Sequence, residues 1–203
     1  MSIHAVIFDL GGVLVRTDDR LPRTRLAESL GMSYAELSAL VFEGPSARQA
    51  TLGQISEQEH LEATCLALKK PASEWQTFRE AFFAGDGIDN ELVDFIRRLR
   101  PKYKTGILSN AWSGVRQWLT EFWRIMDAFD EAVLSAEVGL MKPDPRIYAL
   151  ALQQLGVLPA EAVFVDDFNE NVEAARRLGL HAIRFLNRAQ ALAELKLVLD
   201  SQE

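Results

Sequence analysis

Short apolar runs alternate with helical patterns near both ends of the chain. Five runs rich in Ala, Val, Ile, Leu and Phe are predicted to be buried strands: residues 5–9, 105–110, 132–135, 162–166 and 182–185. Apolar residues at helical spacing predict helices between them, at residues 91–99, 147–155 and 172–178. Gly156 and Gly179 follow the last two, where glycine commonly ends a helix. This alternation predicts an α/β fold, a Rossmann-like parallel sheet with helices on both faces.

A long middle stretch, residues 21–83, carries only helical patterns. Ser56 with Glu59 is a predicted capping box that starts a helix over residues 57–68. We therefore predict an inserted α-helical cap above the carboxyl end of the first strand. The predicted domains are an α/β core, residues 1–15 and 86–203, and a helical cap, residues 16–85. A last helix, residues 189–199, is predicted to pack on the sheet.

Composition excludes several classes of protein. The 203 residues are 48% hydrophobic and 25% charged, which is typical of a globular chain. The net charge of -7 and the lack of a dense Lys/Arg run argue against nucleic acid as a partner. No stretch resembles a signal peptide or approaches the roughly 20 apolar residues needed to cross a bilayer. With a single cysteine, Cys65, we expect a cytoplasmic protein without a membrane partner.

Polar residues follow several of the predicted strands. In an open parallel sheet, ligands bind beyond the carboxyl ends of the strands. The residues expected at this edge are Asp9, Ser109, Asn110, Lys142, Asp166 and Asp167. Three carboxylates in one place need compensating charge, which a divalent cation and a phosphate together would provide. Magnesium prefers oxygen ligands and is usually held by one or two carboxylates and substrate phosphate.

Each of these residues also has a purely structural interpretation. Asp9 before two glycines could be a turn residue. The Asp166–Asp167 pair and the Ser109–Asn110 pair could each cap the helix that follows. Lys142 could be a solvated surface lysine. A site is favoured because these residues follow separate predicted strands in an order that one mechanism explains.

Four segments together resemble the haloacid dehalogenase-like hydrolase superfamily over nearly the whole chain. They are FDLGGVL at 8–14, ILSN at 107–110, KPDPRIY at 142–148 and VDDFNENVEAARRLG at 165–179. The insertion after the first segment resembles the cap of the branch in which the cap follows strand one. Within that branch, the double Asp and the Gly-Gly are most similar to bacterial phosphatases acting on glucose 1-phosphate and to the phosphatase domain of soluble epoxide hydrolases.

The resemblance implies a magnesium-dependent phosphohydrolase that cleaves small, sugar-phosphate-like metabolites. Asp9 would attack phosphorus and form an aspartyl-phosphate. Magnesium would be held by the Asp9 carboxylate, the main-chain carbonyl of Gly11 and Asp167. Asp166 would lie close by, as a further ligand or orienting water.

The resemblance also assigns the residues that contact the phosphoryl group. Ser109 would donate a hydrogen bond to a phosphoryl oxygen, with the main chain of Asn110 assisting. Lys142 would offset the charge on Asp9 and the transferred group. Such electrostatic and positioning tasks carry most of phosphoryl-transfer catalysis.

Gly11 departs from the superfamily pattern, in which the residue two after the nucleophile is usually a second Asp that transfers protons. Loss of general acid–base help costs about 10²–10⁴-fold in rate, and a leaving group of low pKa would suffer least. Asp18 could replace the missing acid, or Asp18 and Asp19 could cap the first inserted helix. Asn171 stands where many members carry a further Asp, and we expect it to hydrogen-bond Lys142 or the main chain.

Two other functions stay open at this point. A haloacid dehalogenase-type hydrolase would attack carbon without a metal and would use an Arg soon after the nucleophile, a position that Arg16 could fill. A catalytically impaired binding protein is the other alternative, suggested by Gly11.

Substrate selection is expected on the insertion, near residues 16–20 and 43–56, where Arg16, Asp18, Arg48 and Gln49 could reach a leaving group. Three tryptophans after the second motif are expected to pack against the sheet, or less favourably to form a partner surface: Trp112, Trp118 and Trp123. We expect a monomer or homodimer.

Overall fold

The centre of the computed structural model, which describes residues 2–200, is a five-stranded sheet. Its order is β5-β4-β1-β6-β7, and all four neighbouring pairs are parallel. The strands are β1 (Ala5–Phe8), β4 (Lys104–Ser109), β5 (Glu131–Leu134), β6 (Ala162–Asp166) and β7 (His181–Arg184). Each lies within one residue of its predicted position, which confirms the α/β fold. The central strand is β1, so its carboxyl end lies between those of β4 and β6.

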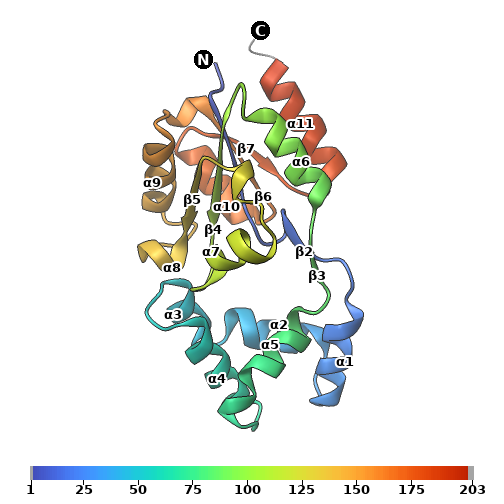
Figure 1. The fold of residues 1–203 in the computed structure, drawn as a ribbon. Coiled ribbons are helices and arrows are strands. Elements are labelled where there is room, and N and C mark those ends of the chain that lie inside the picture. The colour runs from blue at the N-terminus through green and yellow to red at the C-terminus, as the bar shows by residue number, and fades with distance from the viewer. Residues whose placement is uncertain (1, 201–203) are drawn as a thin grey trace.

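Helices cover both faces of the sheet (Figure 1). One face carries α6 (Asn90–Leu99) and α11 (Arg188–Asp200), and the other carries α9 (Pro145–Leu155) and α10 (Asn169–Arg177). Alternate residues of β1 divide between the two layers: Val6 and Phe8 pack in the first, Ala5 and Ile7 in the second. Side chains of a strand point to opposite faces in turn, so a wholly apolar β1 is what a sheet buried on both sides requires.

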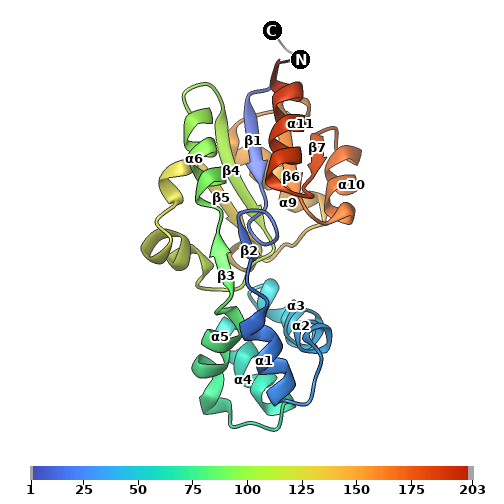
Figure 2. The same cartoon turned by 90° about the vertical axis from the view of Figure 1, so that its right-hand side faces the viewer.

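The predicted insertion forms a separate group of helices, which we call the helical lobe (residues 21–83; Figure 2). It consists of α1 (Leu21–Ser29), α2 (Tyr34–Glu43), α3 (Ala47–Thr51), α4 (Glu57–Ala67), the short η1 (Ala72–Glu74) and α5 (Trp75–Phe83). The lobe has an apolar core of its own, which includes Leu37, Leu61 and Phe82. The capping box of Ser56 and Glu59 at the start of α4 is present as predicted.

A two-stranded antiparallel ribbon connects the lobe to the sheet (Figure 2). It pairs β2 (Val15–Thr17) with β3 (Asp86–Ile88) and was not predicted, because three residues give no readable alternation. Asp86 anchors the ribbon to the lobe, since it accepts hydrogen bonds from Thr17 Oγ1 at 2.6 Å and from Nη2 of the buried Arg23 at 3.0 Å.

The remaining elements are short. They are α7 (Val115–Gln117), η2 (Trp118–Phe122), η3 (Met126–Ala128), α8 (Ser135–Val138) and η4 (Pro159–Glu161). The prediction that the tryptophans pack on the sheet is correct for Trp123, which lies against the sheet core. It is wrong for Trp112, which packs into the core of the helical lobe. Trp118 contacts the lobe too, with the Arg79 guanidinium carbon 4.2 Å from its ring centroid.

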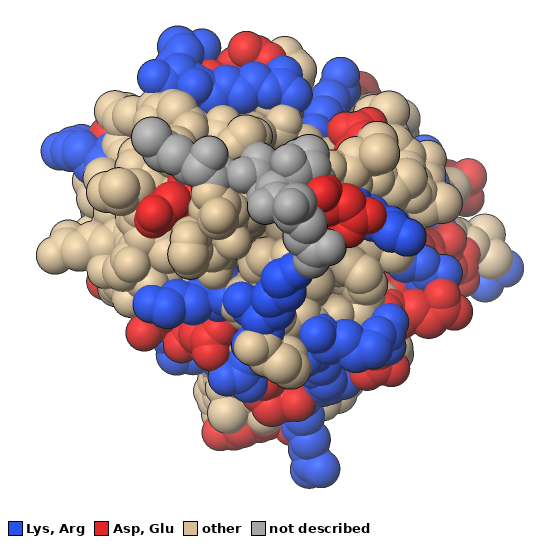
Figure 3. Space-filling model, turned by 90° about the horizontal axis from the view of Figure 1, so that it is seen from above, with Lys and Arg blue, Asp and Glu red and all other residues tan. Residues whose placement is uncertain are grey.

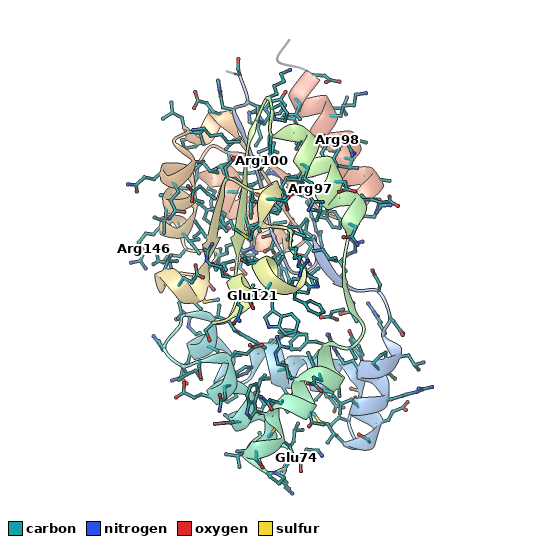
Figure 4. The ribbon with its side chains drawn as sticks, in the orientation of Figure 1. Glu74, Arg97, Arg98, Arg100, Glu121 and Arg146 are labelled. Carbon is teal, nitrogen blue, oxygen red and sulfur yellow. The ribbon has the colours of Figure 1, made fainter. Side chains whose placement is uncertain are left out.

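The end of the molecule opposite the lobe carries a mixture of charges. Seen from this end, Lys and Arg lie beside Asp and Glu around a large uncharged area (Figure 3). Arg97 pairs with Asp94 and Asp127, and Arg100 pairs with Asp130. Arg97, Arg98 and Arg100 lie far from the lobe, whose tip carries Glu74 (Figure 4). In the described chain, every helix is too short or too polar to span a bilayer.

Candidate active site

The sheet order brings the ends of three strands together at the edge that faces the helical lobe. Phe8, the last residue of β1, lies beside Ile107 of β4 and Val165 of β6. The next residue is Asp9, whose main-chain N–H donates to Val165 O at 2.9 Å. The side chain of Ser109, at the end of β4, is close enough to the Asp9 carboxylate to act to lower the pKa of Asp9. Residues that are far apart in the sequence therefore meet at one point.

Lys142 lies between two of the carboxylates and is only 2% exposed. Its Nζ is 2.8 Å from Asp9 Oδ1 and 2.6 Å from Asp166 Oδ2. A buried charge is strongly destabilising without partners, so the interpretation of Lys142 as a surface lysine is wrong. Burial acts to lower the pKa of Lys142, but the charges of Asp9 and Asp166 outweigh it and the pKa is raised. Lys142 is therefore cationic and offsets part of the negative charge of Asp9 and Asp166.

The main chain of Lys142 is held by the Asn110 side chain. Asn110 Nδ2 donates to Lys142 O at 3.0 Å, and Lys142 N donates to Asn110 Oδ1 at 2.7 Å. An amide side chain can satisfy a peptide group in both directions in this way. The side chain of Asn110 thus fixes the loop that carries Lys142. This contact was not predicted, because the sequence motif suggested a role only for the Asn110 main chain.

Asp166 is fully buried, and both of its oxygens are occupied. Oδ1 accepts from Phe168 N at 2.8 Å, and Oδ2 accepts from Lys142 Nζ. Asn171 Nδ2 lies 3.1 Å from each oxygen. We expected the side chain of Asn171 to bind Lys142 or the main chain. This expectation was wrong, because the side chain binds Asp166. A neutral amide donor supports the carboxylate without adding charge, so Asp166 acts as the counter-ion of Lys142.

Asp167 differs from Asp166 in having a free acceptor. Its Oδ1 is buried without a hydrogen-bond partner among the described residues. Gly12 lies directly beside it: φ is +78°, and a Cβ on Gly12 would lie 2.2 Å from Asp167 Oδ2. Carboxylate oxygens of Asp9, Asp166 and Asp167 all lie within 4.8 Å of one another. A buried carboxylate oxygen without a partner in the described chain, beside two other carboxylates, fits a divalent cation.

The electrostatics of Asp9 favour the same conclusion. Its Oδ1 accepts from Leu10 N at 2.7 Å. Burial raises the pKa of Asp9 to about 7, against the opposing charge of Lys142 and with the help of the charge on Asp166. Burial and the Asp166 charge likewise raise the pKa of Asp167. A cation between Asp9 and Asp167 would favour the ionised form of both.

The remaining residues selected from the sequence lie in different surroundings. Gly11 is exposed, and a Cβ there would meet no described atom within 4 Å. Arg16 donates from Nη1 to Val13 O and from Nη2 to Asp89 Oδ2, each at 2.8 Å. Asp18 is exposed, with an oxygen 3.7 Å from Arg16 Nε. The structure therefore gives Arg16 a structural partner and leaves Asp18 at the surface.

Acidic residues were expected to cap the first helix of the lobe, and Arg48 and Gln49 were expected to reach a leaving group. Asp19, rather than Asp18, accepts a hydrogen bond from Leu21 N at the start of α1. Arg48 Nη1 lies 3.6 Å from Sδ of Met141, the residue before Lys142. Arg48 thus lies where the lobe meets the Lys142 loop, and Gln49 beside it is exposed.

Comparison with known proteins identifies relatives that are similar to this chain over nearly its whole length. The phosphorylated carbohydrates phosphatase of Thermotoga maritima is 32% identical over 95% of this chain and 91% of its own length. The D-ribitol-5-phosphate phosphatase of Bacteroides thetaiotaomicron is 26% identical over 98% of this chain and its full length. The rat bifunctional epoxide hydrolase 2 is 29% identical to the whole chain, which spans only 40% of that relative's length.

Solved structures agree in fold. A wild-type HAD family enzyme from Bacteroides thetaiotaomicron, in complex with magnesium and inorganic phosphate, has a TM-score of 0.73 and 25% identity, covering 90% of this chain and 94% of that one. A HAD-like family hydrolase from Porphyromonas gingivalis has a TM-score of 0.75 and 27% identity, covering 97% and 98%. A family model described as haloacid dehalogenase-like hydrolase matches residues 3–179. With this match over most of its length, the chain belongs to the haloacid dehalogenase-like hydrolases.

Proposed function

We propose that this protein is a magnesium-dependent phosphohydrolase that cleaves small phosphorylated metabolites, of the sugar-phosphate kind, through an aspartyl-phosphate on Asp9. The observation that carries the proposal is the buried Lys142 between Asp9 and Asp166, beside an Asp167 oxygen that has no partner among the described residues. Relatives named as phosphatases of carbohydrate and ribitol phosphates support the substrate class.

The cation would be held by the Asp9 carboxylate, the Gly11 carbonyl and Asp167. The unpartnered Asp167 oxygen and the close approach of Gly12 support this set. Asp166 is not included, because Lys142, Phe168 N and Asn171 already occupy it. Bound magnesium would supply positive charge that favours ionised Asp9 and offsets the charge on the phosphoryl oxygens. A related enzyme solved in complex with magnesium and inorganic phosphate supports magnesium as the cation.

The reaction needs two displacements at phosphorus. A carboxylate oxygen of Asp9 forms a bond to phosphorus while the bond to the leaving oxygen breaks. Water then attacks the phosphorus of the aspartyl-phosphate and releases phosphate and free Asp9. Ser109 donates a hydrogen bond to a phosphoryl oxygen, and Lys142 balances the charge that develops there. Gly11 offers no acid, so the leaving oxygen takes its proton from solvent.

The same proposal extends to domain organisation. The core would comprise residues 1–15 and 86–203, and the cap would comprise residues 16–85. The separate apolar cores of the sheet layers and of the helical lobe support this division. The two chain crossings between them form the β2–β3 ribbon, where a small change in backbone angles would move the lobe relative to the sheet.

Phosphate release tests the function directly. The purified protein should release phosphate from aryl, acyl and sugar phosphates with magnesium, and EDTA should stop the reaction. Asp9→Asn should lose the activity, whereas Asp18→Asn, a matched change at an exposed carboxylate, should keep it. Full activity in Asp9→Asn would refute the mechanism. Chloride release from a 2-haloacid would instead indicate a dehalogenase, and beryllofluoride binding without any turnover would indicate a binding protein.

A further inference from the structure

The helical lobe meets the sheet layer at the segment that follows Ser109. Trp112 packs among lobe rings, with its centroid 5.9 Å from Phe42 and 6.2 Å from Phe83. The next residue, Ser113, accepts a hydrogen bond from Glu57 N of α4 at 2.9 Å. Trp112 is only three residues beyond Ser109, which limits their Cα separation to about 11 Å. Trp112 is therefore held between the candidate phosphate site and the lobe.

Residues 42–51 of the lobe form the other side of this contact. Phe42 stacks on Trp112, Arg48 touches Met141, and Thr51 O accepts from Ser135 Oγ at 2.7 Å. Met141 precedes Lys142, so two of the three contacts are made to segments that carry candidate site residues. The carboxyl end of α2 and the helix α3 therefore lie along the edge of the sheet that holds the site.

Phe42 and Trp112 form a stacked pair of rings, of which Phe42 is the more exposed member. Their rings are close to parallel, with an interplanar angle of 28°, and Phe42 remains 49% exposed. Phe83 packs against Trp112 with an interplanar angle of 77°. Ligand pockets are lined mainly by apolar and aromatic faces beside a few polar groups, and this ring pair lies next to the segments that carry Ser109 and Lys142. Such a face binds another ring by stacking.

We propose that Phe42 and Trp112 form the wall that selects the organic part of the substrate, which carries a ring with a flat apolar face. The proposal rests on the proposed function, because it places the phosphoryl group at Asp9 and Ser109. It makes Phe42 and Trp112 specificity-determining residues and leaves the phosphoryl chemistry to other side chains.

Two non-hydrolysable ligands that differ only in the ring test this selection. With magnesium present, the wild-type protein should bind phenylphosphonate about three- to tenfold more tightly than methylphosphonate by calorimetry. Phe42→Ala should remove this difference and keep the affinity for methylphosphonate. Phe122→Ala, a matched change at a ring that is 68% exposed, should keep the difference. Because Phe42 is half exposed and is not one of the buried residues of the lobe core, its replacement should leave that core folded.

Equal affinity of the wild-type protein for the two phosphonates would overturn the proposal, and so would an unchanged preference in Phe42→Ala. A loss of affinity for both ligands in Phe42→Ala would also contradict it, because that result indicates a structural role. The measurement needs no turnover. A protein that releases no phosphate from any substrate would refute the proposed function, while the ratio of the two affinities would still decide the role of the ring pair.

Discussion

Two adjacent glycines that follow Asp9 and Leu10 have opposite requirements for the residue at their position. Gly12 has a positive φ, and any Cβ there would overlap the Asp167 carboxylate. Only glycine lets the main chain approach this acid so closely. Gly11 has open space at its Cβ position and a φ that other residues can adopt. The backbone therefore leaves room for a side chain at position 11, and the absence of a carboxyl group there is a property of the sequence.

This contrast leads to a prediction about the leaving group. Gly11→Asp should raise kcat for alkyl phosphates, which need a protonated leaving oxygen, by about tenfold or more. Acetyl phosphate, whose leaving group needs no proton, should gain little. Steady-state rates with both substrates measure the effect. Gly12→Ala is the control and should lose magnesium-dependent activity. A Gly11→Asp variant that is slower on every substrate would contradict this account.

At the scale of elements, Asp89 joins three parts of the fold. It is 6% exposed and accepts from Nη2 of Arg16, in β2 of the ribbon, at 2.8 Å and from Nη1 of Arg188, in α11, at 2.6 Å. It also caps α6 by accepting from Leu92 N at 3.0 Å. Burial acts to raise the pKa of Asp89, but the hydrogen bonds from Arg16, Leu92 and Arg188 outweigh it and lower the pKa.

Replacement of Asp89 should therefore weaken the whole fold. In Asp89→Ala the free energy of unfolding should fall by about 2–4 kcal/mol, since the partly buried Arg16 loses its partner and α6 its cap. Urea unfolding followed by circular dichroism measures this change. Asp18→Ala, at an exposed partner of the same Arg16, should change stability by less than about 0.5 kcal/mol. Equal losses in the two variants would mean that the Asp89 contacts contribute nothing specific.

At the scale of the whole molecule, the ionised forms of Asp9 and Asp167 lower the stability of the fold. The folded protein raises the pKa of Asp9 from 3.8 to about 7, so between these values it binds more protons than the unfolded chain does. The contribution of Asp9 to stability is therefore largest at low pH and is lost as pH rises from about 4 to 7. The raised pKa of Asp167 acts in the same direction. A bound cation would reverse this penalty.

Magnesium should consequently stabilise the protein more at high pH than at low pH. At a concentration about 100 times Kd, the gain should approach ~2.7 kcal/mol at about pH 8 and be much smaller at about pH 6, because protons compete for Asp9 and Asp167. Thermal unfolding with magnesium or EDTA measures the gain. Asp167→Asn should lose most of it. A gain that is independent of pH, or that persists in Asp167→Asn, would argue against these two acids as ligands.

Local sequence determined most of the sheet and the positions of its chemistry. Two apolar runs, Ala5 to Phe8 and Ala162 to Val165, are each followed by an acidic residue. Short runs that are apolar at every position predict strands that are buried on both faces of a sheet, and both runs are buried. Parallel strands end at a common edge, so the amino-acid pattern alone predicted that Asp9, Ser109 and Asp166 lie together. Gly11 and its missing acid were likewise visible in the sequence.

Tertiary structure alone decided which polar groups pair with one another. Asn110 binds Lys142 across 32 residues, and Arg16 binds Asp89 across 73. The orientation of separate elements decides three of these contacts: Arg16 with Asp89, Asn171 with Asp166, and Trp112 with the lobe. Periodicity along one segment carries no information about that orientation, because it is fixed by the packing of apolar faces from distant parts of the chain.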